Sequence, residues 1–252
     1  MKKNLLFILI TLFLSCKKEA SINDLSREKW NGKIKTITSS TYFYDSTKAD
    51  PHLGELINKS IRTFNMDGNE TSVTYVNKED RVESIKQNSY NDKKQKISAK
   101  ETDQDNNTLN SFEFKYDKND LLVEVNTTDF TTNQKSKQIN TFDPMRNLIG
   151  SISYKGDNEI DFKAENKYDD KNQLIEEKIF LPDGTMDYKA ITSYDEKGRA
   201  ATNTGYANDG TVIWVLKNDY KVFDKDGNWL LKNIIRDGKA INVVQVQIEY
   251  YP

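Results

Sequence analysis

Few side chains in this chain have the type and spacing that catalysis or metal binding requires. The only histidine, His52, lies in a loop-like segment, and one histidine alone supplies neither a histidine-rich zinc site nor a convincing general base. The acidic pairs Asp169-Asp170 and Glu176-Glu177 lie in or beside strand-like sequence, where adjacent side chains point to opposite faces. We therefore predict no catalytic residue, no metal site and no cofactor.

Two tryptophans, Trp214 and Trp229, are the residues that we select as candidate binding residues. Flat aromatic rings stack on the apolar faces of sugars and contact peptides at low entropic cost. The regularly spaced tyrosines and phenylalanines could act in the same way, but aromatic rings also hold neighbouring strands together. We interpret the regular rings as structural and expect function in the residues that vary along the chain.

The only cysteine, Cys16, has the sequence context of a lipid attachment site. Lys2 and Lys3 precede an apolar run, Leu5 to Leu14, that is too short to cross about 30 Å of hydrocarbon and is typical of a secretory signal. Leu14-Ser15-Cys16 resembles the bacterial lipobox, in which the thiol receives the diacylglycerol. We predict a signal peptide over residues 1–15 and an acylated Cys16 that begins a polar tether over residues 16–29. The residues after Cys16 favour the outer membrane, on either its periplasmic or its cell-surface face.

The composition indicates a folded protein with a thin core. Hydrophobic residues make up 36% of the 252 and charged residues 30%, which alone would suggest disorder, but aromatic residues reach 11% and need burial. The 39 acidic and 37 basic residues are mixed along the chain, so nucleic acid is not an expected partner.

A repeated aromatic residue, followed in most copies by Asp or Asn, organises the rest of the chain. Between Phe64 and Tyr194 it recurs every 26 residues, and turn-forming residues follow it each time. We call the full set the anchor residues and predict that they are structural: Tyr44, Phe64, Tyr90, Tyr116, Phe142, Tyr168, Tyr194, Phe223 and Tyr250.

Each 26-residue unit predicts two antiparallel strands joined by tight turns. From Met186 to Tyr194, alternate residues share a face, as in a strand: one face holds Met186, Tyr188, Ala190, Thr192 and Tyr194, and the other holds Asp187, Lys189, Ile191 and Ser193. We expect residues 30–252 to form an all-β domain of β-hairpin repeats, arranged as an elongated, twisted single sheet or an open solenoid-like array. Closure into a barrel stays an open alternative. In an open array, residues 30–44 and 243–251 would cap the edges.

One unit resembles a known repeat. Tyr194-Asp195-Glu196-Lys197-Gly198-Arg199-Ala200 is similar to the YD (Rhs-like) repeat, and the segments that begin at Tyr116 and Tyr168 are similar to it with Asp or Asn in the glycine place. With the lipobox, the chain resembles small YD-repeat lipoproteins of Bacteroidetes-type bacteria. The resemblance implies an exported β-protein and carries no catalytic residues.

Our leading hypothesis is an exported, lipid-anchored, non-enzymatic protein that binds a protein or a glycan at the cell envelope. The membrane, reached through the lipid anchor, is its expected first partner. One alternative is an envelope glycan-acting hydrolase that uses two surface carboxylates 5 to 10 Å apart, roughly the separation in glycosidases. Another is an immunity-type protein that neutralises a toxin.

Overall fold

The computed structural model describes residues 23–156 and 158–252, and these residues form β-strands and one short helix. The helix α1 (Asp24–Arg27) precedes the strands. The strands are β1 (Ile34–Tyr44), β2 (Leu53–Phe64), β3 (Glu70–Val76), β4 (Val82–Tyr90), β5 (Lys96–Thr102), β6 (Thr108–Tyr116), β7 (Leu122–Asp129), β8 (Gln134–Phe142), β9 (Leu148–Lys155), β10 (Glu159–Tyr168), β11 (Leu174–Phe180), β12 (Met186–Tyr194), β13 (Ala200–Ala207), β14 (Val212–Phe223), β15 (Trp229–Arg236) and β16 (Lys239–Tyr250).

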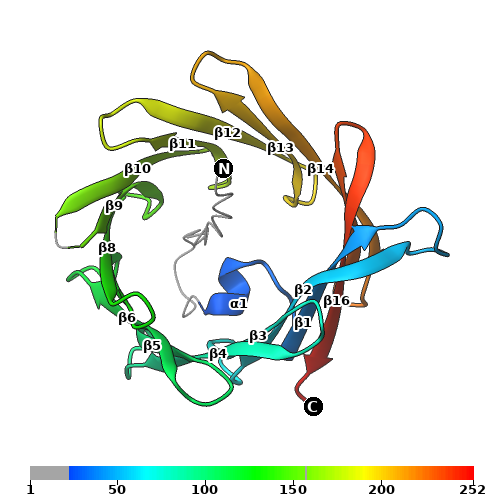
Figure 1. Cartoon of the computed structure of the whole chain (residues 1–252), viewed down its shortest axis with the longest axis horizontal. Coiled ribbons are helices and arrows are strands. Elements are labelled where there is room, and N and C mark those ends of the chain that lie inside the picture. The colour runs from blue at the N-terminus through cyan, green and yellow to red at the C-terminus, as the bar shows by residue number, and fades with distance from the viewer. Residues whose placement is uncertain (1–22, 157) are drawn as a thin grey trace.

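The strands form one closed antiparallel barrel, in which each strand pairs with its neighbours in sequence and β1 pairs with β16 (Figure 1). In the closing pair, Ile37 lies opposite Ile248. The chain is therefore all-β, but the elongated single sheet or open solenoid-like array that we expected is wrong. The two predicted edge caps pair with each other instead, which satisfies the backbone groups that two free edges would expose.

The anchor residues lie close to the turns of the barrel. Phe64, Tyr90, Tyr116, Phe142, Tyr168 and Tyr194 each end an even-numbered strand at one rim, which we call the α1 rim because α1 lies inside it. Tyr250 ends β16 at the same rim. Tyr44, at the end of β1, lies at the opposite rim, where its ring contacts that of His52 at 4.9 Å between centroids.

The turns of the α1 rim share one geometry. In the turn after β10, the Asp169 carboxylate accepts hydrogen bonds from the backbone N–H groups of Lys171 and Gln173 at 3.0 and 2.8 Å. Asn172 has a φ of 57°, a left-handed conformation that Asn and Gly adopt at lowest cost. Gly198 takes the same place after β12, with a φ of 74°. The aspartate and the fourth turn residue thus define a tight turn, which is a local feature of the chain.

The tyrosines at this rim point into the barrel and bond to its wall. The Tyr168 hydroxyl donates to the carbonyl of Leu148 at 3.1 Å, and Tyr194 donates to Leu174 at 2.8 Å. Tyr220 donates in the same way to Ala200 at 3.2 Å. Sequence reasoning missed Tyr220, although it follows Tyr194 by 26 residues, because Phe223 directly precedes the next aspartate.

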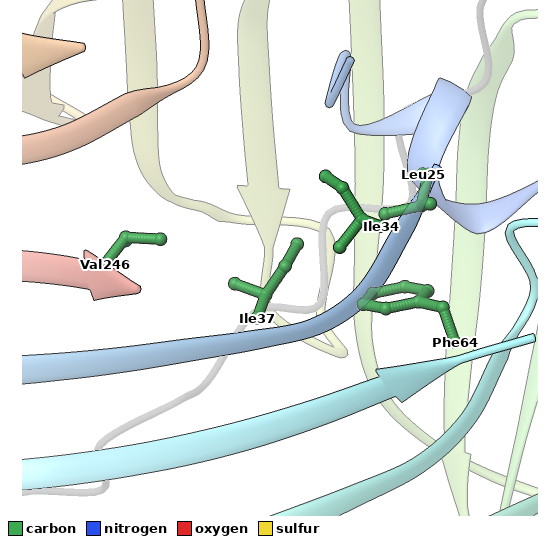
Figure 2. Close-up of a cluster of buried hydrophobic side chains, with 5 residues drawn as sticks. All are labelled: Leu25, Ile34, Ile37, Phe64 and Val246. Carbon is green, nitrogen blue, oxygen red and sulfur yellow. The ribbon is translucent and has the colours of Figure 1, made fainter. Parts of the chain in front are cut away.

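A small apolar cluster fills one side of the α1 rim (Figure 2). Leu25 of α1 packs with Ile34, Ile37, Phe64 and Val246, and Phe64 is only 1% exposed. Of the predicted tether, residues 16–29, the structure describes the part from Asn23 onward, and that part packs inside the barrel. Cys16 and the predicted signal peptide lie outside the described residues.

Candidate ligand-binding site

A pocket of about 420 Å³ opens inside the α1 rim, between the segment that follows α1 and the turns on the far side of the barrel. We call residues 27–31 the rim segment. The rim segment faces the ends of β10, β12 and β14 and the start of β15. These strands and their turns supply the other side chains that line the pocket. The lining comprises Arg27, Glu28, Lys29, Trp30, Asn31, Tyr168, Asn172, Gln173, Tyr194, Lys197, Gly198, Arg199, Ala200, Tyr220, Gly227, Asn228 and Trp229.

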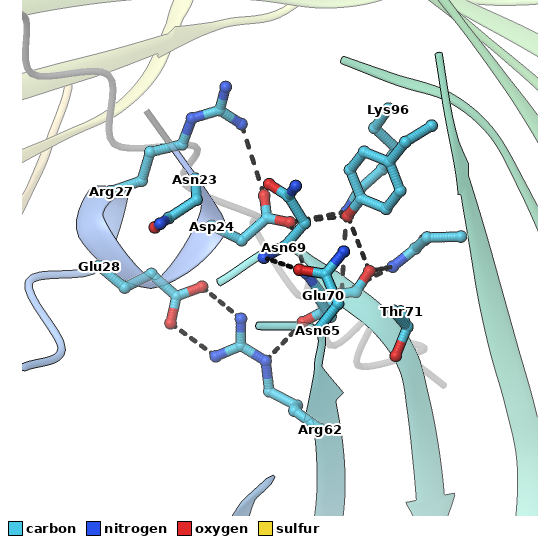
Figure 3. A network of polar contacts seen from close by, with 12 residues as sticks. Asn23, Asp24, Arg27, Glu28, Arg62, Asn65, Asn69, Glu70, Thr71 and Lys96 are labelled. Atoms are coloured by element: carbon cyan, nitrogen blue, oxygen red, sulfur yellow. Dashed lines mark hydrogen bonds and ion pairs between the residues drawn. The ribbon is translucent and has the colours of Figure 1, made fainter. Parts of the chain in front are cut away.

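Charged groups hold one end of the rim segment against the wall (Figure 3). The Arg62 guanidinium donates two hydrogen bonds to Glu28, both at 2.6 Å, and one to Glu70 at 2.5 Å. Burial disfavours the charge on Arg62, but its bonds to Glu28 and its attraction to both carboxylates outweigh burial and raise the pKa of Arg62. Arg62 therefore stays charged and joins the helix end to β2 and β3.

Asp24 adds a second attachment of α1. It accepts hydrogen bonds from the Tyr90 hydroxyl at 2.7 Å and from the Glu70 N–H at 2.8 Å, and Lys96 lies 4.0 Å away. Burial raises the pKa of Asp24, but Lys96 and these two donors outweigh it, so the pKa lies below its usual value. Asp24 is thus held as a carboxylate at neutral pH.

The opposite end of the rim segment reaches across to distant turns. Lys29 donates to the carbonyl of Gly198 at 3.2 Å. The Asn31 N–H donates to the Asn228 side chain at 2.8 Å, and the Asn228 amide donates back to the Asn31 carbonyl at 2.9 Å. Attached at both ends, the rim segment forms one wall of the pocket.

Aromatic rings line much of the pocket. Trp30 and Trp229 lie 5.6 Å apart between ring centroids, and Tyr220 meets Trp229 edge-on at 5.9 Å. Burial raises the pKa of Tyr168 and of Tyr194 to about 12, so both hydroxyls are neutral. Because the hydroxyls of Tyr168, Tyr194 and Tyr220 donate to backbone carbonyls, the rings contribute their apolar surfaces to the pocket.

The two tryptophans that we selected from the sequence lie apart. Trp229 lines the pocket, whereas Trp214 packs on Gly205 and Tyr188 further along the lumen and donates to the Asn203 side chain at 2.8 Å. Trp30, which completes the aromatic pair with Trp229, was missed. It stands outside the 26-residue pattern, and no sequence signal joins residues so far apart.

The acidic pairs do not form an active site. Asp169 supports a turn, and Glu176 and Glu177 point to opposite faces of β11, where Glu176 pairs with Lys167 at 2.9 Å. His52 stays at the opposite rim and bonds to the Lys48 carbonyl through Nδ1. Within residues 23–156 and 158–252, no group of three or more His, Cys, Asp or Glu side chains is arranged to hold a metal ion.

The outer face of the barrel wall carries many charged side chains, beside exposed apolar ones such as Ile191, Ile213 and Val215. Side chains that alternate with the lumen-facing residues point outward, and on β10 and β11 they include Lys163, Glu165, Lys167, Glu176 and Lys178. Ion pairs form on this face, such as Lys115–Glu124 at 2.5 Å. None of the helices in the described part of the chain is long and apolar enough to cross a membrane.

The fold is similar to that of a known barrel. A porin-like protein from Bacteroides uniformis matches 86% of this chain and 98% of its own length, with a TM-score of 0.59 and 10% sequence identity. The chain therefore shares the closed-barrel fold of that protein. No protein-family model and no curated protein matches the sequence.

The predicted relation to YD-repeat lipoproteins is not supported. The structures of TcdB2-TccC3 match with a TM-score of 0.33 over about 15% of that chain, too weak a similarity to carry an argument. The porin-like barrel accounts for nearly the whole chain instead. The motif misled because Tyr-Asp-x-x-Gly describes a tight turn with a left-handed fourth residue, and such a turn can join antiparallel strands in unrelated folds.

Proposed function

We propose that this protein is a non-enzymatic binding protein of the cell envelope that holds a glycan in the pocket of the α1 rim. The observation that carries the proposal is the aromatic lining, with Trp30 and Trp229 side by side and three tyrosine rings beside them. A volume of about 420 Å³ suits a small ligand or a few sugar rings. A protein partner would need a much larger contact surface.

The pocket offers little for hydrolysis. Among the described residues, Glu28 is the only carboxylate that lines it, and both oxygens of Glu28 accept hydrogen bonds from Arg62. A glycosidase needs a second carboxyl group across the substrate, with at least one of the two free to exchange a proton. We therefore favour binding without turnover.

Titration of the purified full-length protein with a panel of oligosaccharides, followed by tryptophan fluorescence, tests this proposal. We expect Trp229→Leu to weaken binding at least about fivefold, because loss of one stacked ring costs about 1–3 kcal/mol by analogy with ring stacking on bases. Trp214→Leu is the matched control and should bind normally, since Trp214 lies outside the lining. Equal binding by both variants, or binding of a protein but no glycan, would reject the proposal.

A second candidate is a channel that spans the outer membrane, which the porin-like fold favours. The charged side chains of the outer face argue for a wall in water instead, because a membrane-spanning wall carries an apolar band and a Lys at mid-bilayer costs about 2–4 kcal/mol. Lys178 on β11 lies opposite Glu165 on β10 in the strand register, and in a membrane-spanning wall both side chains would face lipid.

Labelling in proteoliposomes distinguishes the two arrangements. A Lys178→Cys variant should react with a water-soluble maleimide as fast as Lys225→Cys, which lies in a turn. Protection of Cys at position 178 alone would show that the wall is embedded in lipid and would support the channel.

A further inference from the structure

The charges around the pocket are unequal. In the part of the chain that the structure describes, four cationic side chains line it, against the single carboxylate of Glu28. The four are Arg27, Lys29, Lys197 and Arg199. Glu28 forms its ion pair with Arg62, which is not part of the lining. The negative charge of Glu28 is therefore already neutralised by Arg62.

Two of the four cations have carboxylate partners. Arg199 donates to Asp195 through Nε at 2.7 Å and lies 2.6 Å from it through Nη2. Arg27 reaches Asp24 only at 3.5 Å, and Asp24 is shared with Lys96 and Tyr90. Within the described part of the chain, the Nε of Arg27 is buried and has no hydrogen-bond partner.

The other two cations, Lys29 and Lys197, have no carboxylate within ion-pair distance among the described residues. Lys29 bonds to the carbonyl of Gly198 and lies 5.9 Å from the centre of the Tyr194 ring. Lys197 directly precedes Gly198 in the same turn, with its ammonium 5.9 Å from the Phe223 ring centre. Two unpaired ammonium groups therefore flank one turn beside the aromatic lining.

We infer that the ligand of this pocket is an acidic glycan, whose carboxylate, phosphate or sulfate group binds between Lys29 and Lys197 while its sugar rings stack on Trp229 and Trp30. This inference rests on the proposed function and adds the charge of the ligand. The amide groups of Asn172 and Gln173, which also line the pocket, can donate to the same anion or to sugar hydroxyls. Charge-assisted hydrogen bonds are the stronger ones, so the two lysines should decide which glycan is held.

The test uses trigalacturonic acid and its fully methyl-esterified form, which have the same rings with and without charge. We expect the acid to bind at least tenfold more tightly, since a hydrogen bond to a charged group contributes about a factor of ten or more. Raising NaCl from 50 to 500 mM should weaken the binding of the acid but not that of the ester, because salt screens charge.

Two sets of variants separate this inference from the proposed function. Lys29→Gln combined with Lys197→Gln should remove the preference for the acid, whereas Lys225→Gln, an exposed lysine in a neighbouring turn outside the lining, should not. Equal binding of both probes, unchanged in the double variant but lost in Trp229→Leu, would overturn the inference and leave glycan binding in place. Failure of both probes to bind would overturn both. Circular dichroism of each variant verifies that it folds.

Discussion

At the scale of single residues, Arg62 is the group on which the position of α1 depends most. It is the common partner of Glu28, on the C-terminal end of α1, and Glu70, which is 6% exposed at the start of β3. Removing it would leave the buried Glu70 carboxylate with only its longer ion pair, to Lys96 at 3.8 Å.

We expect Arg62→Met to lower the free energy of unfolding by about 3 kcal/mol, because a buried carboxylate that loses its closest cationic partner keeps most of its desolvation cost. Urea denaturation measures the change. Lys59→Met is the control: its pair with Asp80 at 2.9 Å is largely exposed and should contribute less than about 1 kcal/mol. An equal loss in the two variants would contradict the role given to Arg62.

Glu177 provides a prediction about pH. Burial raises the pKa of Glu177. Ionisation then disfavours the folded state, so stability falls as pH rises from the unfolded pKa of about 4.3 through the raised folded value. Glu177→Gln should therefore be more stable than the natural protein at pH 7 and equal to it at pH 4, by thermal unfolding.

The neighbouring Glu176 is the matched control for that pH prediction. Its pKa is lowered by hydrogen bonding to Lys167, despite some burial, so its stabilising effect is present above its unfolded pKa and lost as pH falls through the folded value. Glu176→Gln should thus give no gain at pH 7. A gain in both variants would show that net charge, not burial, is responsible.

At the scale of elements, the turns of the α1 rim fix the ends of the strands that surround the pocket. The fourth turn residue always has a positive φ, but only some units place glycine there. Lys94, with a φ of 62°, occupies this position after β4. A side chain in the left-handed region costs about 1–2 kcal/mol, which glycine avoids.

We expect Lys94→Gly to raise the free energy of unfolding by up to about 1 kcal/mol, after the loss of its exposed ion pair with Asp67. Lys93→Gly, one residue earlier and outside the left-handed region, also loses an exposed ion pair, with Asp120 at 3.0 Å. It should be destabilising, because glycine adds unfolded-state entropy there and relieves no backbone strain. Chemical denaturation measures both variants. The change in the free energy of unfolding should be positive for Lys94→Gly and negative for Lys93→Gly, and the same sign in both would contradict the turn geometry.

At the scale of the whole molecule, closure between β1 and β16 distinguishes the barrel from an open array. Closure brings Thr38 opposite Gln247 in the register of the two strands. In an open array these residues would lie at opposite ends of the sheet.

A Thr38→Cys and Gln247→Cys double variant should therefore form an intramolecular disulfide under oxidising conditions, seen as faster migration on a non-reducing gel. Thr38→Cys with Glu83→Cys, a residue on β4, is the negative control, because β4 does not pair with β1. Monomers without a cross-link in the first variant would contradict closure.

The sequence by itself determined the features that depend on neighbours along the chain. The alternation from Met186 to Tyr194 makes a strand with two faces, and Asp195 followed by Gly198 makes a turn, because both depend on contacts within a few residues. For the same reason the all-β class was open to sequence reasoning, whereas the family assigned from the Tyr-Asp turns was wrong.

Only the tertiary structure decided the closure of the barrel and the pocket inside the α1 rim. Closure depends on pairing the first and last strands, and no local pattern encodes how far sixteen twisted strands curve. The pocket joins Lys29 to Gly198, 169 residues away, and Asn31 to Asn228, 197 residues away. Trp229 was visible in the sequence as a candidate, but its partners Trp30, Lys29 and Lys197 became a site only when the barrel brought the α1 rim together.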